Sequence, residues 1–235
     1  MATLTSYKKL AQKLVRQRRR DDVRARIGQL RERIDRTGAA LRTGRAGVIA
    51  HLARVIAAEG MTNPDECLLL MELAAAVEDG AIVEIGSYRG RSTVALAIGS
   101  QCGNGRPVYA VEPHEEFVGE FGAHFGPADR TAFFKNVLRC HASETVRLIN
   151  LPAETVARSW DLPIGLLWID GDHRYEAVKK DYEMWTPHLR PGTLVCFDDS
   201  ATGKGGPHRL VSELTQSGAY RTVEVVGKVT VLRHA

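Results

Sequence analysis

Carboxylate side chains follow two apolar segments of the chain, and their spacing could support chemistry. Asp170 comes directly after Ile164 to Ile169, and Asp198 and Asp199 come directly after Leu194 to Phe197. Both segments are typical of buried strands, and the carboxyl ends of parallel strands meet at one edge of a sheet. Three converging carboxylates repel one another unless a proton or cation intervenes, and an all-oxygen set suits Mg²⁺ or Mn²⁺ rather than zinc. The sequence therefore predicts a divalent-metal site at Asp170, Asp198 and Asp199, with capping of helices or turns by Asp172 and Asp198 as the alternative.

A glycine-containing turn lies earlier in the chain, where an apolar strand leads into a helix between Ile82 and Thr93. Gly86 and Gly90 permit a tight turn with close backbone approach, which predicts a ligand against that turn. Tyr88 stands where a dinucleotide-binding fingerprint has its second glycine, so the pattern is E-x-G-x-x-x-G. The next apolar strand ends at Glu112, the position from which a carboxylate binds ribose hydroxyls in nucleotide-binding sheets.

At these residues the chain resembles the class I S-adenosylmethionine (SAM) dependent methyltransferases. Residues 60 to 235 resemble in particular the metal-dependent O-methyltransferases of the catechol type and of the macrocin and sugar type. In those enzymes one Asp after the fourth strand and an Asp-Asp or Asp-Asn pair after the fifth strand hold the metal. Asp170, Asp198 and Asp199 match that set. The resemblance thus implies a SAM- and divalent-metal-dependent O-methyltransferase.

The resemblance also implies where SAM binds. The glycine turn would frame the methionine end of SAM, and Glu112 would hold the ribose. The turn from Leu151 to Glu154 would approach the adenine, through its backbone because Pro152 and Ala153 replace the usual acidic or hydroxyl residues. The predicted cofactor-binding residues are Glu84, Gly86, Ser87, Gly90, Ser92, Glu112 and Ala153.

His173 marks a departure from the family. The catechol type places a catalytic lysine three residues after the metal-binding Asp, and this chain has His173 there. A metal lowers the pKa of a bound alcohol while a neutral imidazole accepts its proton near pH 7. We therefore predict His173 as general base, with Asp170 as the metal-binding partner in catalysis and Asp172 orienting His173 or a substrate hydroxyl. The alternative for His173 is capping of the helix that starts near Arg174.

The acceptor is predicted to be a sugar, glycoside or polysaccharide precursor, as a small molecule or an oligosaccharide. Vicinal oxygens can chelate a metal, and the bacterial branch of the family favours sugars. Lys204 and His208, in the loop after Asp199, are predicted to contact substrate, although loop polarity explains them equally well. Two alternatives remain open. One is a phenolic or polyketide acceptor, which an aromatic content of 6% disfavours, and the other is a nucleic-acid-binding protein with a vestigial SAM fold.

The order of apolar segments predicts the fold. Strands alternate with helices, and a hairpin from Thr222 to Arg233 closes the chain, which indicates a mostly parallel sheet with one antiparallel strand. With the resemblance, the expectation is an α/β, Rossmann-like, doubly wound seven-stranded sheet. Asn63 to Glu66 has the pattern of a helix start with a capping box. Residues 113–127, in which aromatic residues alternate with glycines, are predicted to form a mobile lid or substrate loop.

The first 60 residues differ from the rest in charge. Residues 1–36 hold twelve Lys or Arg against four acids, and this net +8 leaves −4 for the remainder. Apolar residues at helical spacing from Ser6 to Gly38 predict an amphipathic helical extension, with Arg42 to Gly47 as linker. We predict residues 1–60 as a basic extension whose apolar stripe packs against the catalytic domain or a second subunit, with a homo-oligomer, most simply a dimer, as the expected assembly. Residues 61–235 are predicted to form the methyltransferase domain. No nucleic-acid partner is expected.

Composition bounds the location of the protein. No apolar run approaches the roughly 20 residues that cross a bilayer. The four cysteines are scattered without a C-x-x-C pair, so neither a zinc cage nor a disulfide framework is indicated. Unpaired cysteines are typical of a reducing compartment, and the expectation is a cytoplasmic protein.

Overall fold

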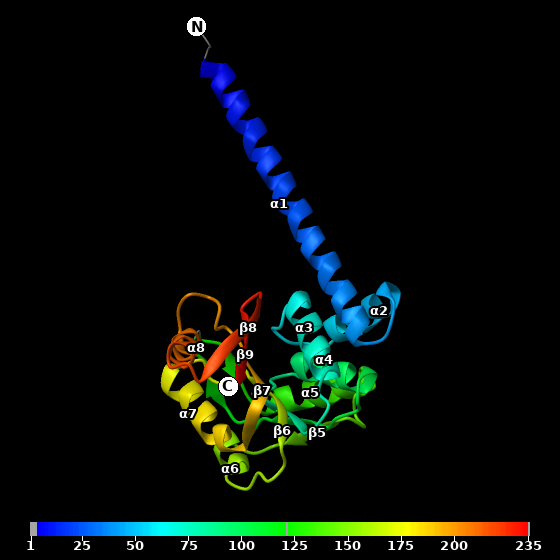
Figure 1. Ribbon diagram of the computed structural model, residues 1–235, viewed down its shortest axis with the longest axis vertical. Helices are drawn as coiled ribbons and strands as arrows, with labels where there is room; N and C mark the ends of the chain where they lie inside the picture. Colours follow the sequence, from blue (N-terminus) through cyan, green and yellow to red (C-terminus); the bar gives the residue numbers. More distant parts are fainter. Residues whose placement is uncertain (1–3, 121, 235) are drawn as a thin grey trace.

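The computed structural model describes residues 4–120 and 122–234, with side chains from residue 22 onward (Figure 1). Its seven main-sheet strands follow one another in the order that the apolar pattern predicts. In chain order the helices and strands are α1 (Leu4–Ala40), α2 (Arg45–Ala57), α3 (Pro64–Ala75), β1 (Ala81–Ile85), α4 (Arg91–Cys102), β2 (Val108–Val111), β3 (Phe117–Val118), β4 (His124–Phe125), α5 (Pro127–Arg139), β5 (Val146–Ile149), α6 (Ala153–Ala157), β6 (Ile164–Ile169), α7 (Tyr175–Trp185), the 3₁₀ turn Thr186–His188, β7 (Leu189–Phe197), α8 (Gly206–Gln216), β8 (Tyr220–Val226) and β9 (Val229–His234). Helices α6 and α8 and the short strands β3 and β4 were not predicted.

The main sheet has seven strands in the order β5-β2-β1-β6-β7-β9-β8. Strands β5, β2, β1, β6 and β7 pair in parallel, and β9 runs antiparallel to both of its neighbours. The predicted α/β fold, with a mostly parallel seven-stranded sheet and one antiparallel hairpin strand, is confirmed. Chain order reverses between β1 and β6, and in doubly wound sheets ligands bind outside the carboxyl ends of the strands at such a point.

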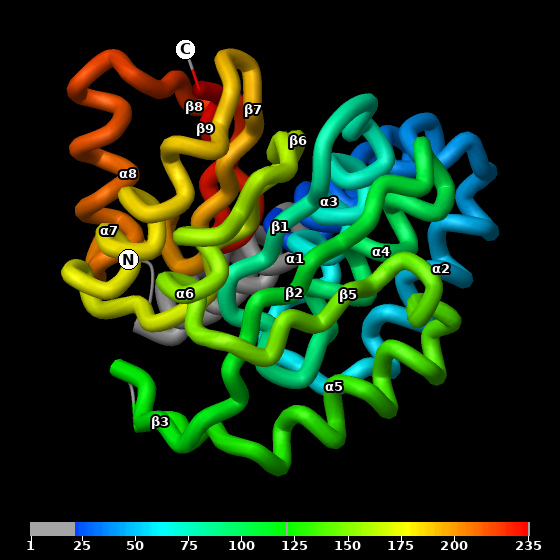
Figure 2. Tube along the Cα trace, turned by 90° about the horizontal axis from the view of Figure 1, so that it is seen from below, coloured from blue at the N-terminus to red at the C-terminus, as the bar shows by residue number. Residues whose placement is uncertain are grey.

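Helices cover both faces of this sheet. Helices α2, α3, α4 and α5 lie on one side, and α6, α7 and α8 lie on the other (Figures 1 and 2). Strand β1 shows why both faces are apolar: Ile82 packs into one core, while Val83 and Ile85 pack into the other. Successive side chains of a strand point to opposite faces, so a strand buried on both sides reads as a continuous apolar run.

Several predicted boundaries shift in the structure. Helix α1 continues to Ala40 and α2 begins at Arg45, so the connection is shorter than the predicted linker from Arg42 to Gly47. Helix α3 ends at Ala75 and not near Gly80. Strand β7 begins at Leu189, five residues before the predicted Leu194, because its first residues pair with the start of β6 across a register shift.

The lid region, residues 113–127, contains the short antiparallel pair β3 and β4. The aromatic rings of Phe117 and Phe125 stack across this pair with centroids 5.5 Å apart, and Tyr88 meets Phe125 edge to face at 5.2 Å. Aromatic packing therefore gives this segment a defined fold against the glycine turn. Phe121 lies outside the described residues.

The basic extension divides into two parts: the first part of α1 extends away from the domain (Figure 1), whereas the end of α1 and all of α2 pack on it. Val48 and Val55 of α2 are fully buried in the core beside α3 and α4. Near the end of α1, Arg33 and Arg36 pair with Glu72 of α3 and Glu224 of β8. Earlier residues of α1 extend away from the domain (Figure 1), and no helix in the described ranges is long and apolar enough to span a membrane.

Candidate active site

A cavity of about 570 Å³ opens at the carboxyl ends of β1, β2, β6 and β7. The glycine turn after β1 and Glu112 after β2 line one part of it, and the acidic residues after β6 and β7 line the other. The lid forms a further wall. Most of the predicted site residues line this one cavity: Gly86, Ser87, Ser92, Glu112, Ala153, Asp170, Asp172, His173, Asp198 and Asp199.

Neighbouring protein atoms leave no room for a side chain at either glycine of the turn, Gly86 or Gly90. Gly86 has φ +81°, and a Cβ there would overlap the Asp170 carbonyl, so only glycine lets the turns after β1 and β6 touch. Gly90 caps α4 with φ +88°, and a Cβ would lie 2.8 Å from the Phe133 ring. Gly86 lines the cavity, whereas Gly90 supports the turn from behind. The close backbone approach expected from the sequence is therefore made to the chain itself.

Glu112 holds the glycine turn in place. Its Oε2 accepts the N–H groups of Ser87 and Tyr88, both at 3.1 Å, and its Oε1 accepts the N–H of His114 at 3.0 Å. A carboxylate offers about four lone-pair sites, so one site remains for a ribose hydroxyl. The residue is thus suited both to shape the cofactor cavity and to bind the cofactor.

Replacing Glu112 by alanine should weaken SAM and S-adenosylhomocysteine binding by roughly 1.5–3 kcal/mol. The loss has two causes, because the hydrogen bond to the ribose disappears and the backbone N–H groups of the turn lose their acceptor. Titration calorimetry with S-adenosylhomocysteine measures it, with the exposed Glu144→Ala as matched control. Equal affinity in the two variants would remove Glu112 from the cofactor site.

Glu84 does not reach the cavity. Its side chain is fully buried, and the Thr93 hydroxyl at the start of α4 donates to Oε2. Burial raises the pKa of Glu84 to about 7, against the lowering effect of its hydroxyl partners Ser92 and Thr93. The predicted contact of Glu84 with SAM is therefore corrected to a bond between β1 and α4 behind the cavity wall, because the strand directs this side chain into the core.

Glu84→Gln should stabilise the protein at alkaline pH. A carboxyl whose folded pKa is raised contributes full stability below its unfolded pKa of about 4.5 and loses it as pH rises through about 7. The variant should therefore unfold near wild-type denaturant concentrations at pH 5 and gain about 1–3 kcal/mol at pH 8. Urea unfolding at both pH values measures this. A variant less stable than wild type at pH 8 would contradict the assignment.

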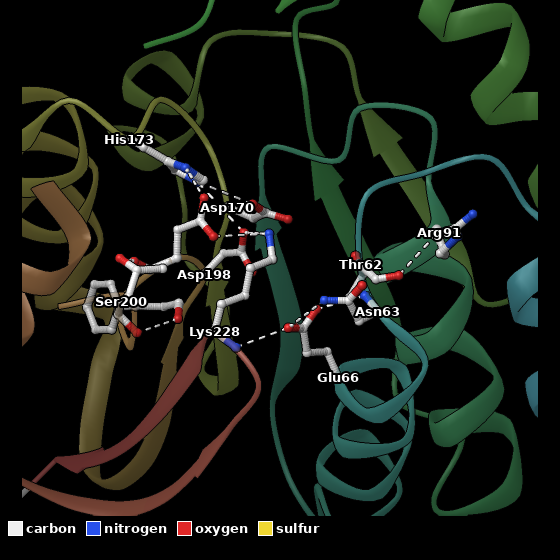
Figure 3. Close-up of polar contacts among 12 residues, drawn as sticks. Thr62, Asn63, Glu66, Arg91, Asp170, His173, Asp198, Ser200 and Lys228 are labelled. Atoms are coloured by element: carbon white, nitrogen blue, oxygen red, sulfur yellow. Dashed lines mark hydrogen bonds and ion pairs between the residues drawn. The ribbon is translucent and has the colours of Figure 1, made fainter. Parts of the chain in front are cut away.

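The acidic residues after β6 and β7 surround His173 (Figure 3). His173 Nδ1 lies 3.1 Å from Asp199 Oδ2, and Nε2 lies 3.4 Å from Asp170 Oδ1 and 3.9 Å from Asp198 Oδ2. One donor atom each from Asp170, His173 and Asp198 lies within 4.8 Å of the others. The predicted convergence of the three carboxylates is present, and Asp199, with φ +48°, faces the imidazole and not that common point.

A lysine that the sequence reasoning missed completes the cluster. Lys228 Nζ lies 2.6 Å from Asp198 Oδ2 and 3.2 Å from Asp199 Oδ1. Lys228 follows Gly227 in the β8–β9 turn, 29 positions after Asp199 in the chain. The sequence predicts the hairpin, but only the antiparallel pairing of β9 beside β7 brings its turn to the carboxylates.

The pKa values in the cluster follow from burial and mutual charge. Burial opposes the charged form of His173, but hydrogen bonds to Asp170 and Asp199 outweigh it and raise its pKa to about 10. Burial raises the pKa of Asp170 and of Asp198, and each is raised despite a cationic neighbour. The hydrogen bond from His173 lowers the pKa of Asp199. With His173 and Lys228 as the cations beside these carboxylates and no other cation added, the imidazole is therefore positively charged near neutral pH.

The remaining predicted substrate residues have local partners. Asp172 accepts the backbone N–H of Arg174 at 3.1 Å and pairs with its guanidinium at 2.7 Å, at the start of α7. The predicted role of Asp172 in orienting His173 therefore passes to Asp199. His208 Nδ1 lies 2.9 Å from the Ser200 carbonyl, and neither Lys204 nor His208 lines the cavity.

An unpartnered atom tests whether this cluster fits a metal ion. Asp198 Oδ1 is buried and has no hydrogen-bond partner among the described residues, and His173 Nε2 is buried with the Asp170 carboxylate 3.4 Å away. Buried polar atoms are normally satisfied, so Asp198 Oδ1 points to a further ligand. Carboxylate oxygens suit a divalent cation, and Asp170 and Asp198 therefore fit one.

Comparison with known proteins agrees with this geometry. Residues 83–200, from β1 through the Asp pair after β7, match the family model described as methyltransferase domain. The chain belongs to this methyltransferase family. Its glycine turn, Glu112 and acidic cluster all fall in the matched segment, whereas Lys228 lies beyond it. The predicted class I SAM-dependent methyltransferase is confirmed at the level of family and fold.

Solved structures share the fold of this methyltransferase. An O-methyltransferase from Bacillus cereus in complex with SAH has a TM-score of 0.58 at 17% identity, over 78% of this chain and 90% of that one. CalS11, a TDP-rhamnose 3'-O-methyltransferase of calicheamicin biosynthesis, has a TM-score of 0.52 at 17% identity, over 80% and 94%. At these identities the likeness is one of fold.

A curated relative is much longer than this chain. The uncharacterized protein y4gI from Sinorhizobium fredii is 28% identical over 143 residues. The match covers 58% of this chain and spans only 15% of that protein.

Proposed function

We propose that this methyltransferase transfers the methyl group of SAM to a hydroxyl of a sugar, glycoside or polysaccharide precursor. The observation that carries the proposal is the pairing of His173 with Asp199 inside the cavity that also contains the glycine turn and Glu112. An oxygen nucleophile needs a proton acceptor beside the methyl donor, and the cavity offers one at that place.

His173 acts as the base through Nε2. Its Nδ1–H donates to Asp199, which fixes the ring and leaves Nε2 directed at the common point of Asp170 and Asp198. A base oriented by a carboxylate on its far nitrogen is a recurring catalytic arrangement. The base must be neutral to accept a proton, which requires that the negative charge beside Nε2 be compensated.

Asp170 and Asp198 are the residues that would hold Mg²⁺ or Mn²⁺, with the predicted third ligand Asp199 engaged by His173 and Lys228. When bound, such an ion lowers the pKa of an acceptor hydroxyl and compensates the carboxylates beside His173. The free Oδ1 of Asp198 supports this assignment. The cavity walls then align the acceptor oxygen with the methyl carbon and sulfur for in-line displacement.

The charge of the cavity narrows the acceptor. Three basic side chains of the described chain line the cavity. Arg91 donates to backbone carbonyls, and His173 and Lys228 are paired with carboxylates. Asp181 and three lid glutamates also line the cavity and form no ion pair among the described residues: Glu115, Glu116 and Glu120. A negative lining repels anionic groups, so the proposed acceptor is a neutral or amine-bearing glycoside and not a sugar nucleotide.

A phenolic or polyketide acceptor is the second candidate. Three aromatic side chains line the cavity, although the aromatic content of the chain is low: Tyr88, Phe117 and Phe125. Aromatic rings stack on planar phenols and also pack against the apolar faces of sugar rings. This lid therefore fits either class, and the choice requires an assay.

Matched acceptors test the proposal. Purified protein with labelled SAM is assayed against methyl glucoside, methyl glucosaminide, methyl glucuronide and catechol, with Mg²⁺ and with EDTA. Methylation of the neutral or amino sugar, dependent on Mg²⁺ and absent in Asp198→Ala, is the expected result. Preference for catechol would establish the second candidate, and preference for the glucuronide would refute the charge argument.

Assembly through α1 is the proposed role of the extension. Val23, Ile27 and Leu30 lie on one face of the helix with exposed fractions of 55%, 47% and 37%. Burying such a face against a second copy removes apolar surface from water. The separable arm ends before Arg33, because Arg33 and the helix after it are attached to the domain.

Deleting residues 1–32 should therefore reduce the number of subunits measured by light scattering while S-adenosylhomocysteine affinity stays within about twofold. Val23→Glu with Ile27→Glu, in the full chain, should give the same change in size, since charges on that face oppose its burial. An unchanged size in both variants would exclude assembly through this helix.

A further inference from the structure

The side chain of Lys228 is held in a defined position beside the carboxylates of Asp198 and Asp199. This side chain is 24% exposed and enters the cavity from the β8–β9 turn, with Nζ in contact with Asp198 Oδ2 (Figure 3). Nζ also contacts Asp199 Oδ1. An exposed lysine side chain usually samples many rotamers, and holding it in one rotamer costs conformational entropy. Here two carboxylates fix its ammonium group.

The backbone of Lys228 is held from both sides. Its N–H donates to Glu66 Oε1 at 3.1 Å, and its carbonyl accepts the N–H of Ala201 at 3.0 Å. Glu66 is fully buried, and a Cβ at Gly227 would overlap its carboxylate, so glycine at that position permits the approach. The turn can therefore present the lysine side chain in one direction only.

Glu66 also shapes the cofactor side of the cavity. Its Oε2 accepts the N–H of Asn63 at 2.7 Å, which completes the capping box predicted at the start of α3. The preceding segment, Gly60 to Thr62, lines the cavity. The carboxylate of Glu66 thus joins a cavity wall to the lysine turn, although Glu66 and Lys228 are 162 positions apart in the chain.

Lys228 takes one oxygen of Asp198 and leaves the other free. Oδ2 pairs with Nζ, whereas Oδ1 is buried without a partner. The ammonium group and an added divalent cation therefore use different oxygens of the same carboxylate. The three negative charges of Asp170, Asp198 and Asp199 are balanced by the single charge of the ammonium group together with the double charge of the ion. Neither cation balances them alone.

We propose that Lys228 is a positioning residue that acts as the resident cation of the acid cluster. It holds Asp198 and Asp199 in place before any ion or substrate binds, and its charge restrains the affinity of the cluster for a divalent ion. The first part is independent of the proposed function, and the second rests on the metal assignment within it.

Melting of the full-length protein in EDTA tests the first part. Lys228→Met should lower the melting temperature by roughly 5–10 °C, because removing one partner leaves buried carboxylates uncompensated. Lys228→Arg keeps the charge and should lose less than half as much. The control Lys179→Met removes a lysine whose ammonium lies 3.8 Å from Glu183 on the surface of α7, and should shift melting by under about 2 °C. Should Lys228→Met not fold, Lys228→Gln replaces it.

Calorimetric titration with Mn²⁺ tests the second part. Lys228→Met should bind Mn²⁺ at least about tenfold more tightly than wild type, since a positive charge next to the ligands is gone. Glu66→Gln loosens the lysine and should shift Mn²⁺ affinity in the same direction by less. A purely structural lysine would instead weaken Mn²⁺ binding on removal.

Two results would overturn the proposal: melting of Lys228→Met equal to that of Lys179→Met, or Mn²⁺ affinity unchanged or weaker in Lys228→Met. If neither wild type nor Lys228→Met binds Mn²⁺, the metal assignment of the proposed function fails. The melting comparison in EDTA then still decides the role of Lys228.

Discussion

Asp198→Ala is expected to reduce methyl transfer by at least roughly 10³-fold and to abolish Mn²⁺ binding. Asp198 is 3% exposed, contacts Lys228 through Oδ2 and carries the unpartnered Oδ1. Its removal takes away a donor that the proposed ion requires and leaves the Lys228 ammonium without its closest carboxylate. Initial rates with labelled SAM and calorimetric Mn²⁺ titration measure the two effects.

The matched control for this variant is Asp161→Ala, because Asp161 is exposed and lies outside the cavity. It should keep wild-type activity and Mn²⁺ affinity. S-adenosylhomocysteine affinity should also be retained in Asp198→Ala, since Glu112 and the glycine turn are intact. Full activity of Asp198→Ala in EDTA would refute the metal assignment.

His173→Ala is expected to slow the chemical step by roughly 10²- to 10⁴-fold. The imidazole is the proposed proton acceptor, with Nδ1 bound to Asp199 and Nε2 facing the acceptor position. Mn²⁺ should remain bound, because Asp170 and Asp198 are unchanged. Single-turnover rates at saturating acceptor separate this loss from weaker substrate binding.

His141→Asn is the control for the loss of a histidine. His141 is exposed with φ +52°, a conformation that asparagine tolerates. If His173→Ala loses Mn²⁺ together with activity, His173 is a metal ligand, in agreement with the 4.8 Å grouping of Asp170, His173 and Asp198. If it keeps full rate, the proton goes to another group.

Local pattern was sufficient for much of the fold and site. The apolar runs predicted the order of the main-sheet strands, and Asp170, Asp198 and Asp199 all lie beside His173 because parallel strands place their carboxyl ends at one edge. The capping box at Glu66 was likewise readable, since its residues are three positions apart. These features depend on spacing within a segment or on the polarity of strands, which sequence carries directly.

Roles that depend on side-chain direction were less accessible. Glu84 was predicted to touch SAM, but strand alternation points it into the core below α4. Asp172 was predicted to orient His173 or a substrate hydroxyl, yet it binds Arg174 just before α7 while Asp199 contacts the imidazole. One-residue differences decide such roles, because neighbouring side chains on a turn or strand point to different sides.

By itself, the sequence determined the alternation of strands and helices, the turn after β1, and carboxylates at the ends of β6 and β7. Only the tertiary structure showed that the β8–β9 turn brings Lys228 to Asp198 and Asp199, and that Glu66 holds this turn. The physical reason is that β9 pairs antiparallel to β7, which returns the hairpin turn to the edge where the parallel strands end. Contacts across such long separations arise from packing and leave no local periodicity in the chain.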